Sequence, residues 1–419
     1  MTSISRIRAV VATRMSALTE RQVSFLLAAF YVVLSMVKMR KYLGSGRFWA
    51  EEGKIFYSDI VNLRWDESLG YLFHGHIELA TNALVLFSTF VKFELAPLVT
   101  TFGSFIVQSI PVFLVIAYRD YFVKHWFGIV VFLLALLGLR QSAEVWANSI
   151  NLHFHFALLA GFLLCKPIVN DKPDWFSRAL LLLSGMSGIP ANFLTPLYFV
   201  AAYHERSRER TVQAMILSVT TVIQFLLIML HQSSLEGRFI DFDPLTFWIG
   251  LLSQQVISPF LWAKAGTSVI NIMKDLPGSG AGGWLVMLAF SIIYVLLGVF
   301  LAQSRNRISK LLAASAFLLA MASVYASLGD KSVFLSLDGA GRYFFAPNCL
   351  LLLAWLGTID NYRKMGIRIA LFIMVLIFAG RVDAYIHGKP WNTALMESIV
   401  QNKDLVEIWP TGWEMKRPR

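Results

Sequence analysis

Long apolar runs alternate with short polar segments along most of this 419-residue chain. A helix that crosses a bilayer needs roughly 20 mostly apolar residues, and loops rich in lysine or arginine stay on the cytoplasmic side. Together these rules predict about eleven spans, with the amino end inside and the carboxyl end outside. The predicted spans lie near residues 23–37, 97–118, 126–139, 152–165, 179–187, 193–203, 212–230, 284–301, 311–328, 344–356 and 367–378.

The same pattern divides the chain into five parts. They are a cytoplasmic N-terminus (1–21), an N-terminal transmembrane module (22–230) with a large external loop (38–96), an external or re-entrant segment (231–283), a C-terminal transmembrane module (284–380) and an external tail (381–419). The apolar run 77–90 is short and flanked by charges, so we expect a helix that lies in the membrane interface. The run 247–262 is interrupted by glutamines and a proline, and we expect it to be re-entrant or interfacial.

The composition excludes a soluble globule, since 57% of the residues are hydrophobic, only 15% are charged and the mean hydropathy is +0.61. We therefore expect an all-α polytopic membrane protein. The net charge of +11 reflects basic cytoplasmic loops and does not indicate a nucleic-acid partner. Cys165 and Cys349 both lie in apolar runs, where cysteine behaves as a small hydrophobic residue.

Ionisable residues gather on the predicted external side, whereas the predicted inner loops are short and basic. Directly after the first span, Phe48 and Trp49 precede the adjacent acids Glu51 and Glu52. A carboxylate held at headgroup depth can act as a general base toward a sugar hydroxyl or coordinate a divalent ion. The alternative is a pair of solvated acids at the start of an interfacial helix, where the helix dipole favours them.

Three further motifs lie on the same predicted side. His74 and His76 are two residues apart and precede Glu78, a spacing that with the Glu51–Glu52 pair would suit a metal, although no third spaced ligand accompanies the histidines. Arg342 follows flexible glycines at the mouth of a late span, where a guanidinium either grips a phosphate or extends toward lipid headgroups.

The third motif is a predicted helical stripe of polar residues with the spacing i, i+4, i+7 and i+11. Polar residues within a span face a cavity or a pathway, or form hydrogen bonds that hold helices together. The stripe consists of Glu144, Asn148, Asn151 and His155.

Taken together, these features resemble the GT-C superfamily of integral-membrane glycosyltransferases, whose donor is a polyprenyl-phosphate-linked sugar. The resemblance covers most of the chain as architecture, a bundle of about eleven spans with interfacial helices in the first external loop. Its local motifs are residues 48–56, 144–155 and 341–347. The chain is similar in style to the bacterial O-antigen glucosyltransferases that act on lipopolysaccharide.

The resemblance implies an inverting transfer of a sugar to a cell-surface glycan or a lipid-linked saccharide, at the periplasmic face of a bacterial inner membrane. Glu51 or Glu52 would be the catalytic acid of the first loop, and the sequence does not decide between them. The implied donor-phosphate residues are Arg342, Tyr343 and Lys264. The implied sugar-binding residues are His74, His76, Glu78, Glu144, Asn148, Asn151 and His155.

The implied partners are the polyprenyl-linked donor, the glycan acceptor and membrane lipids, and no nucleic acid. The acids leave Mg²⁺ or Mn²⁺ open as a cofactor, but no second acidic motif fixes a metal, and glutamates stand where the superfamily more often has Asp-Glu or Asp-Asp. We also expect residues 231–283 and the tail tryptophans Trp391, Trp409 and Trp413 to form an acceptor groove.

Two other functions fit an externally facing multispan protein. An O-antigen-type polymerase or ligase would place its largest external loop and its arginines late in the chain, whereas the acids here are early. A transporter or flippase for lipid-linked saccharide would show internal repeats and broken helices. The break at residues 188–190 points to the second alternative, but the two halves of the chain show no convincing repeat.

Overall fold

The computed structural model describes residues 19–123, 126–142, 144–169, 171–231, 244–258, 268–272, 306–326, 341–358 and 388–417, together with Phe334 and several residues between 284 and 298. The predicted span 367–378, Lys264 and most of the segment 231–283 lie outside these residues.

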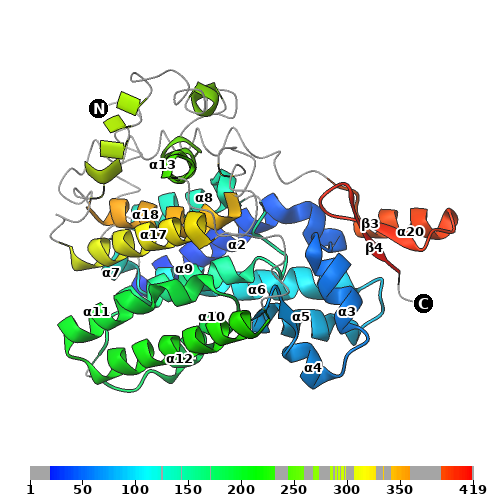
Figure 1. Ribbon diagram of the computed structural model, residues 1–419, viewed down its shortest axis with the longest axis horizontal. Coiled ribbons are helices and arrows are strands. Elements are labelled where there is room, and N and C mark those ends of the chain that lie inside the picture. The colour runs from blue at the N-terminus through cyan, green and yellow to red at the C-terminus, as the bar shows by residue number, and fades with distance from the viewer. Residues whose placement is uncertain are drawn as a thin grey trace.

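The described chain is mostly helical and contains two small antiparallel hairpins (Figure 1). The strands are β1 (Leu72–Phe73), β2 (His76–Ile77), β3 (Leu405–Ile408) and β4 (Trp413–Lys416). The longer helices are α2 (Glu20–Ser45), α5 (Leu79–Thr89), α6 (Ala96–Ala117), α8 (Trp126–Gly138), α9 (Leu152–Cys165), α10 (Trp175–Met186), α11 (Thr195–Glu205), α12 (Arg208–Leu230), α13 (Pro244–Leu251), α17 (Arg307–Ala326), α18 (Phe345–Thr358) and α20 (Trp391–Val400). The short helical turns are η1 (Glu52–Tyr57), α3 (Ser58–Ile60), α4 (Trp65–Leu69), α7 (Arg119–Phe122), η2 (Arg140–Ser142), η3 (Pro190–Leu194), η5 (Leu252–Ile257) and η8 (Gly341–Phe344).

Four of the described helices are long and apolar enough to cross a membrane, namely α2, α6, α12 and α17. The helices α6, α9 and α12 confirm the helical runs predicted at 97–118, 152–165 and 212–230. The count of about eleven spans stays a prediction, because several apolar helices of the bundle are shorter than a bilayer crossing requires. The run predicted at 77–90 forms the eleven-residue helix α5.

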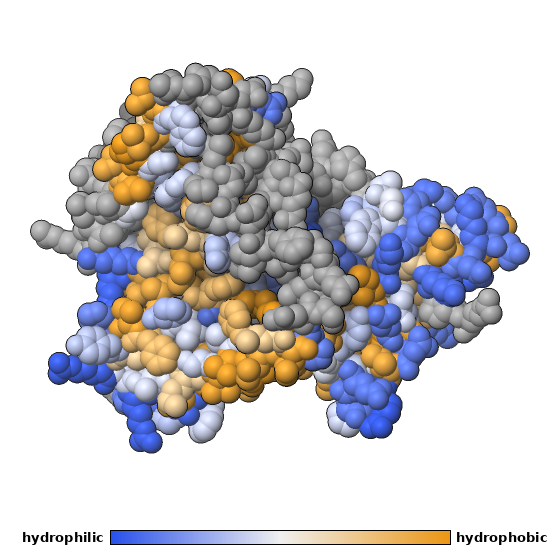
Figure 2. All heavy atoms as spheres, viewed as in Figure 1, coloured by the Kyte–Doolittle hydropathy of each residue, from blue (hydrophilic) through white to orange (hydrophobic). Residues whose placement is uncertain are grey.

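The surface of the bundle is apolar along its flank. On α12, Val219, Val222 and Leu226 are more than half exposed, while Leu217 and Gln224 on the opposite face are buried. Figure 2 shows this hydrophobic flank between two hydrophilic ends. Such a large exposed apolar surface is typical of a protein whose surroundings are lipid.

The chain break at residues 188–190 has a packing role. Gly188 has φ +100°, and its N–H donates to the carbonyl oxygen of Ile77 in β2 at 3.0 Å. A Cβ at this position would lie 2.7 Å from Cβ of His153, so both the backbone angle and the close approach require glycine. The break between α10 and η3 is therefore the place where the β1–β2 hairpin docks.

The first external loop and the tail pack against each other at one end of the bundle, on the right in Figure 1. Trp409 donates its N–H to the carbonyl oxygen of Phe48 at 3.1 Å, and Ala50 donates back to Trp409. The Trp391 ring meets Phe48 and Phe93 edge-on at centroid distances of 5.5 and 5.2 Å. The first loop and the tail therefore lie at the same end of the bundle, and the prediction that both are external stays a prediction.

The basic loop at residues 204–210 lies at the other end. Gln224 of α12 bonds the N–H and the carbonyl of Ile77 at 3.0 and 2.9 Å, which fixes this helix beside the β1–β2 hairpin. Gln224 is sixteen residues beyond Arg208, or about 24 Å along an α-helix. Below we call the end with the first loop and the tail the outer end, and the end with residues 204–210 the inner end.

Candidate functional site

Glu52 is fully buried at the outer end, where it joins two segments of the chain. Its Oε1 accepts hydrogen bonds from the N–H and the Oγ of Ser149, at 2.7 and 2.5 Å. Its Oε2 accepts from the N–H of Trp49 at 3.0 Å. Burial raises the pKa of Glu52, although the bonds from Ser149 and Trp49 and the charge of Arg47 oppose this shift. The Glu52 side chain therefore connects the first loop to the segment before α9.

That segment, residues 144–151, is not a helix, so the predicted helical stripe is wrong in its geometry. It forms a series of turns that ends where α9 begins at Leu152, and Ala147 has φ 56° in the left-handed region. A left-handed residue interrupts a helix, because L-residues rarely adopt that conformation within one. Below we call residues 144–151 the polar loop.

The polar residues predicted as a stripe nevertheless converge, because they hold the polar loop together. The side-chain amides of Asn148 and Asn151 both donate to the carbonyl oxygen of Glu144, at 2.7 and 2.9 Å. Nε2 of His155 lies 3.2 Å from the carbonyl oxygen of Val145. Asn148, Asn151 and His155 are all buried. These contacts support the loop and leave Glu144 as the half-exposed member of the set.

Two residues from distant segments also form hydrogen bonds with the backbone of the polar loop. Gln108 of α6 donates to the carbonyl oxygen of Val145 at 2.8 Å and accepts from the N–H of Ala147 at 2.8 Å. Arg47 donates to the carbonyl oxygen of Trp146 at 2.8 Å. Buried backbone groups of an irregular loop need such partners, and here the side chains of the bundle supply them.

Arg342 and Glu144 are in contact at the half-exposed surface of the outer end, within electrostatic range of Glu51. Nη1 of Arg342 lies 3.3 Å from Oε2 of Glu144, and the guanidinium lies 5.5 Å from the centre of the Tyr343 ring. Burial by itself would lower the pKa of Arg342, but Tyr343, Glu144 and Glu51 together hold it above its usual value. The Tyr343 ring in turn packs edge-on against Phe154 at 5.4 Å. A cation and a carboxylate from two distant segments are therefore paired at this surface, and the carboxylate of Glu51 acts on the cation through its charge.

A second group of charges surrounds Glu78 at the start of α5. Oε1 of this buried carboxylate lies 3.4 Å from Nε2 of His76 and 3.3 Å from Nδ1 of His153. Burial would raise the pKa of Glu78, but His153 and His76 lower it to about 2. His74 lies in the turn between β1 and β2 with φ 50°, and its ring lies 4.0 Å from that of Phe73 at a tilt of 47°. Of the three sugar-binding residues predicted here, His76 and Glu78 are in contact with each other.

The two buried carboxylates belong to one polar network. The Oγ of Thr81 lies 3.0 Å from Oε2 of Glu78 and 2.8 Å from the carbonyl oxygen of Ser149. The N–H and Oγ of Ser149 reach Glu52, as described above. The first loop, the polar loop and the start of α9 therefore form one connected, buried polar structure behind the exposed charges.

The structure does not support the predicted acceptor groove in the tail. Trp391 and Trp409 are buried against the first loop and offer no open aromatic face. Trp413 is half-buried, with Nζ of Lys54 5.3 Å from its ring centre. Lys264, the third predicted phosphate ligand, lies outside the described residues, so the structure does not place it near Arg342.

Sequence reasoning missed Ser149, Gln108, Arg47 and His153. Gln108 carried a usable signal, since a polar side chain near the middle of a predicted span usually faces a partner. Arg47 carried another, because a basic residue on the external side departs from the usual distribution. Ser149 and His153 lie within residues 144–155, but neither belongs to the polar positions with helical spacing. Ser149 contacts Glu52 from the polar loop, and His153 contacts Glu78 from the first turn of α9.

Within the described ranges, no group of three or more histidine, cysteine, aspartate or glutamate side chains is arranged to hold a metal ion. The Mg²⁺ or Mn²⁺ that the sequence left open gains no ligand set there.

Comparisons of the chain with protein-family models, with curated proteins and with solved structures found no match.

Proposed function

We propose that this chain is an inverting glycosyltransferase that moves a sugar from a polyprenyl-phosphate donor to a cell-surface glycan or a lipid-linked saccharide. The observation that carries the proposal is the contact between Glu144 and Arg342 on the half-exposed surface of the outer end, within electrostatic range of Glu51. An acid that accepts a proton and a cation that binds a phosphate are the two groups that this transfer requires. In the proposal, the outer end faces the periplasm from a bacterial inner membrane.

Burial divides the roles of the two neighbouring acids. Both oxygens of Glu52 accept hydrogen bonds from the protein, whereas Glu51 is half-exposed and acts on Arg342. In the proposal, Glu51 takes the proton from the acceptor hydroxyl while that oxygen attacks the anomeric carbon of the donor sugar. The bond from this carbon to the phosphate oxygen breaks with inversion, and polyprenyl phosphate leaves.

Arg342 has the second role. The leaving phosphate gains negative charge in the transition state, so a positioned guanidinium lowers the barrier more than it strengthens ground-state binding. Glu144 orients Arg342 in the unliganded protein, and Glu52 orients the loop that presents Glu51. The break at residues 188–190, which pointed to a transporter, docks the β1–β2 hairpin instead, and we therefore favour transfer over transport.

The test is the affinity of the purified protein for a fluorescent polyprenyl phosphate. We expect Arg342→Gln to weaken binding by about 10- to 100-fold, since hydrogen bonds to charged groups contribute on the order of 1.5–3 kcal/mol. Arg64→Gln is the matched control, because Arg64 is an exposed arginine of the first external loop and its guanidinium pairs with Asp66. Unchanged affinity in Arg342→Gln, or an equal loss in both variants, contradicts the proposal.

A further inference from the structure

The inner end contains an open hollow of about 770 Å³, bordered by the ends of α9, α11, α12 and α17. This volume lies within the range of pockets that hold small molecules. The acids that line it are Asp171 and Glu205. The basic side chains that line it are Lys166, Arg206, Arg210 and Arg307. The lining therefore has an excess of positive charge.

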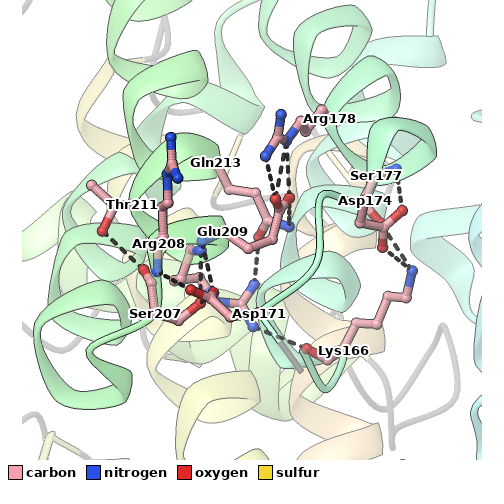
Figure 3. Close-up of polar contacts among 11 residues, drawn as sticks. Lys166, Asp171, Asp174, Ser177, Arg178, Ser207, Arg208, Glu209, Thr211 and Gln213 are labelled. Carbon is pink, nitrogen blue, oxygen red and sulfur yellow. Dashed lines mark hydrogen bonds and ion pairs between the residues drawn. The ribbon is translucent and has the colours of Figure 1, made fainter. Parts of the chain in front are cut away.

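Two acids of the inner end, Asp171 and Glu209, form contacts that connect the segments around the hollow (Figure 3). Asp171 accepts hydrogen bonds from the N–H groups of Arg208 and Glu209, at 3.0 and 2.9 Å, and so caps the start of α12. Glu209 forms a two-point contact with Arg178, whose Nε lies 3.0 and 3.2 Å from its two oxygens. The start of α12 is therefore already occupied by a carboxylate, and any site for a further anion lies in the hollow itself.

Two arginines give the hollow a rigid cationic side. Arg210 is buried and donates to the carbonyl oxygen of Lys166 at 2.9 Å. Glu205 bridges Arg210 and Arg307, at 3.1 and 2.6 Å. The more exposed member, Arg206, follows α11 with φ 50° and lies at the rim. One glutamate thus serves two arginines, and Lys166 pairs with Asp174, so the positive charge that faces the opening is that of the exposed Arg206 and Arg307.

Exposed aromatic residues surround the same end of the bundle. Tryptophan and tyrosine concentrate at the level of lipid headgroups, where one end of the ring is apolar and the other is hydrated. Nζ of Lys166 lies 5.0 Å from the ring centre of Tyr118. Exposed aromatic side chains at the inner end include Tyr121, Trp126, Trp175, Phe176 and Tyr203. The hollow therefore lies at headgroup depth.

We infer that this hollow binds the phosphate of an anionic phospholipid from the adjacent leaflet. Basic pockets between membrane helices bind anionic headgroups in this way. The lining also includes Leu164, Ile168, Ile308 and Leu311, apolar side chains that suit a lipid and not a free phosphate ion. The inference is independent of the proposed sugar transfer, because the two sites lie at opposite ends of the bundle.

The test uses the purified full-length protein in a neutral detergent and measures its melting temperature during titration with short-chain phosphatidylglycerol. Phosphatidylcholine with the same chains and inorganic phosphate are the two comparison ligands. We expect only phosphatidylglycerol to raise the melting temperature at low concentration. In Arg206→Gln/Arg307→Gln, we expect the midpoint concentration to rise by about 25-fold, or about fivefold for each arginine.

Arg208→Gln is the matched control, since Arg208 is exposed at the same end but does not line the hollow. Its midpoint is expected to stay within about twofold of wild type, and Arg307→Lys, which keeps the charge, is expected to retain most of the effect. Equal responses to the two lipids overturn the inference, and so does an equal loss in Arg208→Gln and the double variant. A response to inorganic phosphate alone overturns the assignment to a lipid.

Discussion

Glu52 has no exposed surface, and both oxygens of its carboxylate accept hydrogen bonds from the protein. Glu51, the preceding residue, is half-exposed and contributes to the electrostatic surroundings of Arg342. The two adjacent glutamates thus differ in exposure. The left-handed Ala50 and the turn into η1 direct the carboxylate of Glu52 into the structure and leave that of Glu51 at its surface. At the residue scale, chemistry is assigned to the exposed acid and positioning to the buried one.

Glu78 leads to a prediction about acid stability. Its folded-state pKa of about 2 lies below the ordinary value of 4.5, so its stabilising contribution is fully present above about pH 4.5 and is lost as the pH falls toward 2. The contribution is on the order of 3 kcal/mol. We expect wild type to lose more thermal stability than Glu78→Gln between pH 5 and pH 2, measured as melting temperature in detergent.

Asp66→Asn is the control for this comparison, because Asp66 is an exposed acid of the same loop. Its melting curve should follow that of wild type across the pH range. Parallel losses of stability in wild type and Glu78→Gln would show that the contacts with His76 and His153 do not stabilise the fold.

At the scale of elements, hydropathy was enough to place α6, α9 and α12, because an apolar run that crosses a bilayer has few alternatives to a helix. The polar loop was misread because Glu144, Asn148, Asn151 and His155 have helical spacing. Its true conformation depends on Gln108, 39 residues before Ala147 in sequence. Local pattern contains no information about such a distant partner. The same reason explains why the contact between Arg342 and Glu144 could not be predicted from the sequence, and the external side of the candidate site stays a prediction.

The packing of α20 on the first loop gives a prediction at the same scale. Trp391 is buried between Phe48 and Phe93, and its Nε1 donates to the carbonyl oxygen of Glu94 at 3.0 Å. We expect Trp391→Ala to destabilise this contact by about 3–5 kcal/mol, measured as faster proteolysis of the tail. Trp413→Ala, at a half-buried position, should destabilise the contact clearly less and leave proteolysis of the tail slower. Equal proteolysis rates in the two variants would argue against α20 as the anchor.

At the scale of the whole molecule, the candidate site around Arg342 and Glu144 lies at the outer end and the basic hollow lies at the inner end. The bundle has an apolar flank between two hydrophilic ends (Figure 2). The first loop and the tail share the outer end through Trp409 and Phe48. That the inner end faces the cytoplasm is a prediction from the positive-inside rule. The proposed sugar transfer at the outer face depends on this orientation.

Orientation can be tested by labelling single cysteines, because the native Cys165 and Cys349 are buried. Lys403 in the tail and Lys172 at the inner end are both exposed. A membrane-impermeant thiol reagent applied to intact spheroplasts should label Lys403→Cys and should label Lys172→Cys only after the membrane is opened. Labelling of both from the same side would contradict the assignment of the two ends.

The most direct test of the central claim is the rate of sugar transfer from a polyprenyl-phosphate donor by Glu51→Gln in proteoliposomes. The account predicts that wild type turns over and that the variant loses about 10²- to 10⁴-fold in kcat, the usual contribution of a general base. The amount of folded protein should stay unchanged, since Glu51 is half-exposed. Wild-type turnover in Glu51→Gln would contradict the account.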